Sequence, residues 1–323
     1  MKAIVQNTYG STDVLKFGDI DKPEIADDEV LVRVHAAGVD RGVWHVMAGL
    51  PYPLRLAGYG LRAPKNPVPG MDMAGVVEAI GKNVTRFQPG HEVFGIGKGT
   101  FAEYTRVLEK KLAPKPANLT FEQAAVVAIS GSTALQGLRD HGQVQPGQKV
   151  LIIGASGGVG TYAVQLAKAF GAEVTAVCST TKVDLVRSLG ADHVVDYMRE
   201  DFAAGEQHYD LILDIGGNAS LSRLRSVLSP TGTLVIAGGE TGGRWLGGSD
   251  RQIRAVLLSR FVSQTLRTFI NSENHEDLIV LTGLIESQQV APVIDRRYPL
   301  ADAPKAIRYL LEGHARGKVV ITI

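Results

Sequence analysis

Apolar and polar positions follow two different patterns along the chain, and the change lies near Thr120. Before it, short runs that mix apolar and polar residues, such as 30–34, 74–80 and 101–107, are separated by Gly and Pro. Runs of this kind are typical of β-strands joined by tight turns. We therefore expect residues 1–120 to form a mostly β domain.

Beyond Thr120 the pattern becomes one of apolar strands alternating with helices. Thr120 and Gln123 are placed to form a capping box ahead of the apolar run 124–129. Mostly apolar strands that alternate with helices predict a parallel sheet covered on both faces, in a doubly wound Rossmann fold of the α/β class. We expect this domain to span residues 121–268. The predicted strands are 150–153, 174–177, 193–197, 211–213 and 233–236, and the predicted helices are 161–170, 182–189 and 221–228.

The last part of the chain does not continue the regular alternation of apolar strands and helices. From residue 269 onward we predict a helix over 275–287, a strand over 293–298, a helix over 303–311 and a strand over 318–323. This tail need not belong to the doubly wound domain. In the first domain, the stretch 51–69 contains five prolines, too many for a strand or a long helix. We expect a long loop there that shapes a substrate pocket.

Composition narrows the classes of function. The 323 residues suit two domains, and the net charge of +1 gives no basic excess for nucleic acid. Because no run of about 18 apolar residues occurs, we expect no membrane partner. Cys178 is the single cysteine, which excludes an intrachain disulfide and a zinc lobe of four thiolates. A chain of this kind suits a reducing cytosol, so we expect a cytoplasmic protein.

The strongest motif is the glycine-rich run that follows the strand 150–153 and opens the helix 161–170. Glycines at such a turn let the backbone approach a pyrophosphate, while the free amides of the helix attract its charge. The run therefore predicts a dinucleotide site. Its residues are Gly154, Ala155, Ser156, Gly157, Gly158, Val159 and Gly160.

The end of the next strand indicates which dinucleotide binds. An NAD-selective site places an acidic residue about 20 residues after the glycines, to accept hydrogen bonds from the ribose hydroxyls. Here Ser179, Thr180 and Lys182 occupy that place, and hydroxyls with an ammonium favour the 2'-phosphate of NADPH. The nearest acid in that stretch, Asp184, should be turned away by helical phasing. Tyr197, at the end of the third strand, is placed to cover the same phosphate.

Over essentially its full length the chain resembles the medium-chain dehydrogenase/reductase superfamily. The resemblance implies a GroES-like domain built from both chain ends, 1–120 and 269–323, together with a Rossmann domain and with the nicotinamide in the cleft between them. We also expect cofactor contacts from Thr133, Gly216, Gly238 and Lys318. The motifs that carry the resemblance are the glycine run and residues 36–39, 69–77, 88–95 and 317–320.

The zinc ligands of that superfamily are missing from this sequence. Zinc-dependent members have Cys where this chain has Asp40, and His-Glu where it has Met71-Asp72. His35 and His45 lack further ligands nearby, so we expect no catalytic metal. The chain looks most like the zinc-free quinone oxidoreductase branch, in which the position of Asp40 is commonly an Asn beside the nicotinamide.

The resemblance implies reduction of a quinone or an α,β-unsaturated carbonyl by NADPH. Without a Lewis acid, conjugate reduction is the easier chemistry, because it delocalises the developing charge. We name Asp40 as a candidate catalytic residue, and Tyr52 and Tyr59 as candidate proton donors besides water. An alcohol dehydrogenase or ketone reductase, and a non-catalytic NADPH sensor, remain the alternatives.

Two other enzyme classes fit the sequence less well, and an oligomer is expected. A short-chain reductase would need Lys four residues after a catalytic Tyr, and none of the nine tyrosines has one. The hydrolase pattern G-x-S-x-G occurs at residues 154–158, but there it overlaps the phosphate loop. Relatives often pair edge strands, and residues 266–270 could form such a strand. We therefore expect a homodimer.

Overall fold

The computed structural model describes residues 1–238 and 243–323 and divides the chain into two units. Unit 1 comprises Met1–Ser132, Ser272–Gln288 and Pro292–Ile323, so both ends of the chain belong to it. Unit 2 comprises Thr133–Asn271 and Gln289–Ala291. Among the described residues, no helix combines the length and the apolar character needed to cross a bilayer.

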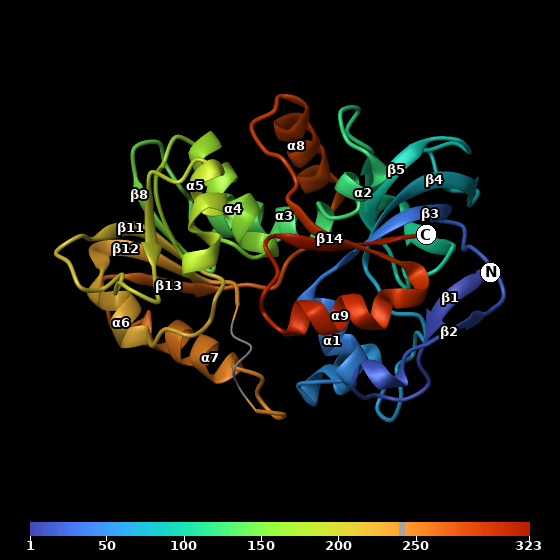
Figure 1. Ribbon diagram of the computed structural model, residues 1–323, viewed down its shortest axis with the longest axis horizontal. Coiled ribbons are helices and arrows are strands. Elements are labelled where there is room, and N and C mark those ends of the chain that lie inside the picture. The colour runs from blue at the N-terminus through green and yellow to red at the C-terminus, as the bar shows by residue number, and fades with distance from the viewer. Residues whose placement is uncertain (239–242) are drawn as a thin grey trace. The chain divides into compact units, whose positions relative to one another are not determined.

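Unit 2 contains the predicted doubly wound fold. Its six parallel strands follow the order β10-β9-β8-β11-β12-β13. Figure 1 shows α4 and α5 on one side of this sheet and α6 and α7 on the other. The α/β class is thus confirmed, and the bounds are as follows: β8 Lys149–Ile153, β9 Glu173–Cys178, β10 His193–Asp196, β11 Tyr209–Asp214, β12 Leu228–Ile236, β13 Thr265–Thr268, α4 Gly158–Ala169, α5 Val183–Ser188, α6 Leu221–Ser226 and α7 Ser249–Leu258.

The apolar strands of unit 2 form its core. Leu151, Ile212 and Leu234 lie on three neighbouring strands and are fully buried. Burial on both faces of the sheet explains why these strands read as continuous apolar runs. A strand buried in this way needs helices over both faces, and the alternation of the sequence supplies them.

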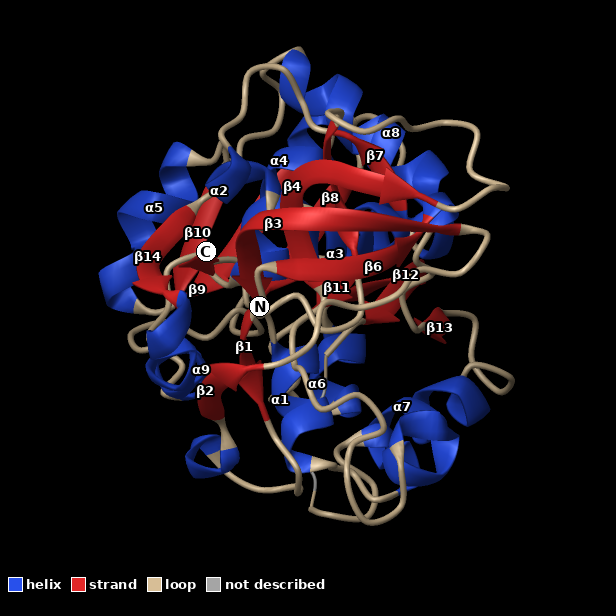
Figure 2. Ribbon diagram, turned by 90° about the vertical axis from the view of Figure 1, so that its right-hand side faces the viewer, coloured by secondary structure: helices blue, strands red, loops and turns tan. Residues whose placement is uncertain are grey.

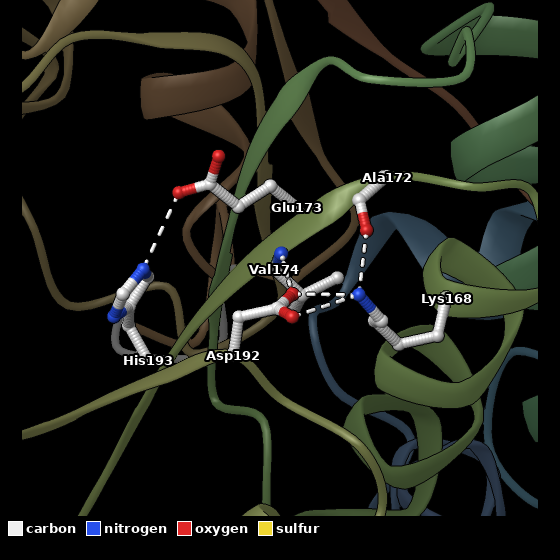
Figure 3. Close-up of polar contacts among 6 residues, drawn as sticks. All are labelled: Lys168, Ala172, Glu173, Val174, Asp192 and His193. Carbon is white, nitrogen blue, oxygen red and sulfur yellow. Dashed lines mark hydrogen bonds and ion pairs between the residues drawn. The ribbon is translucent and has the colours of Figure 1, made fainter.

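The C-terminal end of helix α4 is held against the sheet by ionic contacts of Lys168 (Figure 3). The Lys168 ammonium donates to both carboxylate oxygens of Asp192, at 2.9 and 2.7 Å, and to the carbonyl of Ala172 at 3.0 Å. Asp192 also accepts a hydrogen bond from the amide of Val174 at 2.7 Å. Burial alone would raise the pKa of Asp192, but these donors outweigh it and lower the pKa. The contacts hold α4 against β9, with the helix N-terminus at the carboxyl edge of the sheet.

Unit 1 is mostly β, and its largest sheet joins distant parts of the sequence. The seven strands follow the order β14-β15-β3-β4-β5-β7, with β6 also paired to β3. Figure 2 shows the long strands β3 and β4 and the separate β1–β2 hairpin. The strands are β1 Lys2–Val5, β2 Lys16–Asp19, β3 Glu29–Val39, β4 Asp72–Ile80, β5 Glu92–Ile96, β6 Tyr104–Leu108, β7 Leu112–Pro114, β14 Ile294–Pro299 and β15 Lys318–Thr322.

Helices complete unit 1 and lead into unit 2. The predicted capping box is confirmed, since the Thr120 hydroxyl accepts from the Gln123 amide at 3.2 Å and the Gln123 side chain accepts in return. Helix α9 packs Ala306 and Ile307 into the core beside Val319 and Ile321 of β15. The helices are α1 Arg41–Ala48, α2 Phe121–Ala124, α8 His275–Glu286 and α9 Ala303–Leu311, and α3 Ala128–Gln136 contains the division between the units.

Candidate cofactor and active site

The glycine run forms a tight turn between β8 and α4. Gly154 has a φ of 87°, a conformation that L side chains rarely adopt. Its carbonyl accepts the amide of Gly157 at 3.2 Å, and Gly157 is the N-cap of α4. A Cβ atom on Gly160 would lie 2.1 Å from the Gly154 carbonyl oxygen. Only glycine therefore lets α4 pack this closely on the loop. The first amides of a helix have no partner within the helix and are suited to an anion.

Two further predicted glycines meet Gly154 at the carboxyl edge of the sheet. A Cβ atom on Gly154 would lie 3.0 Å from the amide nitrogen of Gly216, beyond β11. A Cβ atom on Gly238, beyond β12, would lie 2.0 Å from the carbonyl oxygen of Ile215. Backbone thus approaches backbone at the ends of three adjacent strands. We call this close packing of backbone on backbone the glycine cradle; glycines serve this purpose in dinucleotide-binding folds.

The predicted 2'-phosphate residues follow β9 in a short helical turn, Thr180–Lys182. The Thr180 hydroxyl donates to Asp196 at the end of β10, with an Oγ1 to Oδ2 distance of 2.6 Å. Asp196 is the acid beside this turn, whereas Asp184 is paired with Arg187 at 3.3 Å. The sequence reading missed Asp196, although its place at the end of the third predicted strand was a usable signal.

Charges of both signs lie beside this turn. Burial raises the pKa of the Cys178 thiol to about 11; the Asp196 carboxylate adds to the rise, and the Lys182 ammonium opposes it. Arg199 lies 3.6 Å from Asp196 and partly balances that carboxylate. Tyr197 is 58% exposed, so its ring is accessible to a ligand. The turn therefore offers hydroxyls and cations, with one carboxylate already engaged by Thr180.

A buried ion pair at the end of β11 was also missed. Asp214 is fully buried; it accepts the amide of Gly217 at 3.1 Å and pairs with Arg251 of α7. The Nε and Nη1 atoms of Arg251 are buried and have no hydrogen-bond partner among the described residues. A guanidinium with unused donors is suited to an anionic or carbonyl group. No sequence motif connects an aspartate and an arginine so far apart.

In unit 1, Asp40 is the N-cap of α1, a helix that the sequence reading did not predict. Its Oδ1 accepts the Val43 amide at 3.2 Å, while its Oδ2 is buried and has no partner among the described residues. An ionised carboxylate is stabilised by the positive end of a helix. The free oxygen can therefore accept a hydrogen bond from a ligand that brings a donor.

Asp72 lies in a buried ionic cluster near Asp40. Its carboxylate accepts the Ile129 amide at 2.8 Å and the Lys318 ammonium at 3.1 Å, and that ammonium also donates to the Ser130 hydroxyl at 3.0 Å. Burial raises the pKa of Asp72 to about 6; the Lys318 charge opposes the rise, and the Asp40 carboxylate adds to it. The structure thus places Lys318, 2% exposed, in this cluster, and its contact with the cofactor stays a prediction.

The two candidate tyrosines lie in the long segment that was expected to be a loop. It is irregular except for one turn, Arg55–Tyr59. The Arg55 guanidinium lies over the ring of Tyr52, 4.9 Å from its centroid, and Tyr59 is 40% exposed.

The described residues hold no group of three or more His, Cys, Asp or Glu side chains arranged for a metal ion. His35 stacks on Phe121 with the ring centroids 4.4 Å apart, and burial, with the nearby Arg33 charge, lowers its pKa. The Nδ1 atom of His45 lies 2.8 Å from the Leu50 carbonyl oxygen. Both imidazoles thus have contacts typical of packed histidines.

The predicted site residues therefore fall into two groups. Unit 2 contains the glycine run and, beside it, Gly216 and Gly238, as well as the turn after β9, Tyr197 and Thr133. Unit 1 contains Asp40, Tyr52, Tyr59 and Lys318.

Two protein-family models match the sequence. Residues 26–117 match the alcohol dehydrogenase GroES-like domain, and residues 189–321 match the zinc-binding dehydrogenase family. The chain is 35% identical to 2-methylene-furan-3-one reductase of Solanum lycopersicum, over 99% of this chain and 79% of the relative. It is 34% identical to the chloroplastic NADPH-dependent alkenal/one oxidoreductase of Arabidopsis thaliana, with the same coverage.

Solved structures of similar fold cover the full length of the chain. The quinone oxidoreductase of Coxiella burnetii superposes with a TM-score of 0.87 at 28% identity, covering 100% of this chain and 99% of that one. The Escherichia coli quinone oxidoreductase in complex with NADPH superposes with a TM-score of 0.85 at 25% identity, covering 100% of both chains.

Proposed function

The chain belongs to the medium-chain dehydrogenase/reductase superfamily, among its quinone oxidoreductases, and we propose that it reduces a quinone or an α,β-unsaturated carbonyl with NADPH. The observation that carries this proposal is the glycine cradle, in which a Cβ atom on Gly160 would lie 2.1 Å from the Gly154 carbonyl oxygen. A turn this tight followed by a helix N-terminus suits a pyrophosphate.

The residues of unit 2 would hold the cofactor, which supplies a hydride when bound. The first amides of α4 would bind the pyrophosphate. Gly216 and Gly238, which have no side chains, would let the rest of the cofactor lie close to the ends of β11 and β12. Ser179 and Lys182 would hold the 2'-phosphate through a hydroxyl and an ammonium, and Thr180 would join them by turning its hydroxyl away from Asp196. The selectivity for NADPH over NADH then depends on this turn.

The residues of unit 1 would act on the substrate side. The buried Oδ2 of Asp40 would accept a hydrogen bond from an N–H donor such as the nicotinamide carboxamide, because the carbonyl of a quinone or an enone has no proton to donate. Hydride addition to a conjugated carbonyl places negative charge on oxygen, and a proton must follow. We propose water, Tyr52 or Tyr59 as its source. Because the Cys and His ligands are replaced by Asp40 and Met71, we propose that the reaction proceeds without zinc.

The assembly and location are also proposals. β13 ends the sheet of unit 2, and an unpaired edge strand is suited to pairing with a second copy. We therefore propose a homodimer through β13. The single, buried cysteine is compatible with a reducing compartment, and we propose the cytoplasm.

The test is loss of NADPH absorbance with a panel of quinones, enones, enals and simple ketones. We expect turnover with the conjugated substrates and none with simple ketones, and no loss of activity with a chelator. Reduction of ketones alone would favour an alcohol dehydrogenase. Tight NADPH binding without turnover on any of them would favour a sensor. Activity lost to a chelator and restored by zinc would contradict the metal-free mechanism.

A further inference from the structure

The irregular segment of unit 1 presents apolar side chains to solvent at its tip, residues 56–62. Leu56 is 77% exposed, Leu61 is 65% exposed and Tyr59, between them, is 40% exposed. Leucine side chains gain free energy when they leave water, so exposing two of them in one short tip carries a cost. Grouped exposure of this kind marks a contact surface more often than an isolated exposed residue does.

The tip is held in this position by its base. The Arg55 guanidinium lies over the Tyr9 ring, 4.3 Å from its centroid, and its Nε donates to the Gly49 carbonyl at 2.8 Å. The Tyr9 hydroxyl donates to the Gly60 carbonyl at 2.6 Å. Lys65 donates its amide to the Tyr59 carbonyl at 2.8 Å. These contacts fix the backbone on both sides of the leucines.

The segment that contains the tip carries charges of one sign along the sequence. Residues 41–71 contain four basic residues and no Asp or Glu, whereas the whole chain has a net charge of only +1. The rest of the chain therefore sums to −3. Arg62 and Lys65 are exposed, and neither forms a salt bridge within the part of the chain that the structure describes. A positive segment on a nearly neutral chain is suited to an anionic partner.

We propose that the tip 56–62 is a peripheral contact with an anionic lipid surface. Leu56 and Leu61 would enter the region between headgroups and acyl chains, and Arg62 and Lys65 would bind lipid phosphates. A second copy of the chain is the weaker occupant, because two segments of the same charge repel. Nucleic acid would use the charges but would leave the leucines exposed to water.

This surface changes our expectation that the chain has no membrane partner, and it requires no spanning helix. It also concerns substrate supply, an aspect that rests on the proposed function. Apolar quinones and enals partition into lipid. Contact with the surface would let the protein take such a substrate from the bilayer.

The experiment is co-sedimentation of the full chain with vesicles of phosphatidylcholine alone or mixed with phosphatidylglycerol, at low and high salt. We expect binding to the mixed vesicles that weakens with salt. Leu56→Ser/Leu61→Ser and Arg62→Gln/Lys65→Gln should each weaken binding about tenfold or more. Ile279→Ser/Val280→Ser is the matched control, since these two side chains of α8 are 43% and 41% exposed and lie outside the tip.

Three outcomes would overturn the proposal: no sedimentation with either vesicle, equal sedimentation with both, or an equal loss in the control variant. Turnover of a water-soluble quinone by the parent protein is measured in parallel, and circular dichroism shows whether each variant folds. If that turnover is absent from the parent protein while vesicle binding is present, the proposed function fails and the lipid surface stands. If turnover is present while vesicle binding is absent, the lipid surface fails and the proposed function stands.

Discussion

A single methyl group at Gly160 would lie 2.1 Å from the Gly154 carbonyl oxygen, closer than real Cβ contacts allow. Gly205, in the same unit, has no atom nearer than 3.8 Å to the equivalent added carbon. The cofactor site thus depends on the absence of a side chain at one position, whereas a second glycine in the same unit tolerates one.

Gly160→Val should therefore abolish NADPH binding. The added side chain would push α4 away from the loop that binds the pyrophosphate. NADPH titration by fluorescence measures the affinity, and circular dichroism reports whether the variant folds. Gly205→Val is the control and should bind as the parent does. A folded Gly160→Val protein with the parent's affinity would contradict the assignment of the glycine run.

Lys182→Ala should weaken NADPH binding by about ten- to a hundredfold at low salt, because a charge-assisted contact of about 1.5–3 kcal/mol is lost. NADH, which lacks the 2'-phosphate, should be little affected. Salt should weaken NADPH binding more than NADH binding in the parent protein. Paired titrations at two ionic strengths measure both effects, with Lys149→Ala as the control. Equal losses for the two cofactors, or a parent that prefers NADH, would contradict the reading of this turn.

At the scale of elements, the sequence predicted best where a local signal sets the structure. The capping box at Thr120 and the alternation of strands and helices in unit 2 depend on neighbouring residues, and they were found. Helix α1 was missed because Asp40 was interpreted as a ligand-facing residue and not as an N-cap. Helix α7 was missed because it follows a glycine-rich stretch and has no side-chain cap.

Contacts between elements that are distant in the sequence could not be predicted from local sequence patterns. The bond between Lys318 of β15 and Asp72 of β4 spans 246 positions, and the bond between Arg251 of α7 and Asp214 of β11 spans 37. Neither pair has a motif, because tertiary packing alone brings the partners together. The two charged clusters at the candidate site were therefore missed, while the glycine run was found.

Lys318→Met should destabilise the protein by about 3–5 kcal/mol, because it leaves the Asp72 carboxylate buried without its cation. Asp72→Leu/Lys318→Met, which removes both charges, should recover part of that loss. Urea denaturation gives the free energy of unfolding of each. If the double variant were less stable than Lys318→Met, the pair would stabilise the fold by more than the neutralisation of a buried charge.

The pKa of Asp72 makes stability depend on pH. An acid whose pKa rises on folding, here from 3.8 to about 6, binds its proton more tightly in the folded chain. The stability it contributes is complete below 3.8 and is lost as the pH rises through about 6. The free energy of unfolding of the parent, minus that of Asp72→Asn, should fall across this range. Parallel pH curves for the two proteins would contradict a raised pKa.

At the scale of the whole molecule, the two units contain different kinds of sheet and position different groups of residues. The parallel sheet of unit 2 gathers the cofactor residues at one edge, because parallel strands end together. The sheet of unit 1 pairs the C-terminal strand β15 with β3, which ends beside Asp40, and places Lys318 against Asp72. Sequence patterns identified both kinds of sheet, but not which side chains each would bury.

A homodimer through β13 should sediment at about twice the chain mass of 34.5 kDa. Arg267→Pro, in the middle of this strand, removes a backbone donor and should shift the protein toward monomer. Analytical ultracentrifugation over a range of concentrations measures the shift. Ile270→Pro, just beyond the strand, is the control. A parent protein that is monomeric at every concentration would exclude the assembly.

The position of β15 has a consequence for synthesis on the ribosome. β15 pairs with both β14 and β3, so the sheet begun by residues 29–39 stays incomplete until residues 318–322 have been translated. Unit 2 is encoded almost entirely between these strands and can fold on the nascent chain first. Until β15 is made, residues 36–39 of β3 present an open edge that is prone to aggregation, because β6 pairs only with residues 29–33. Chaperones that bind nascent chains should therefore engage unit 1 for longer than unit 2.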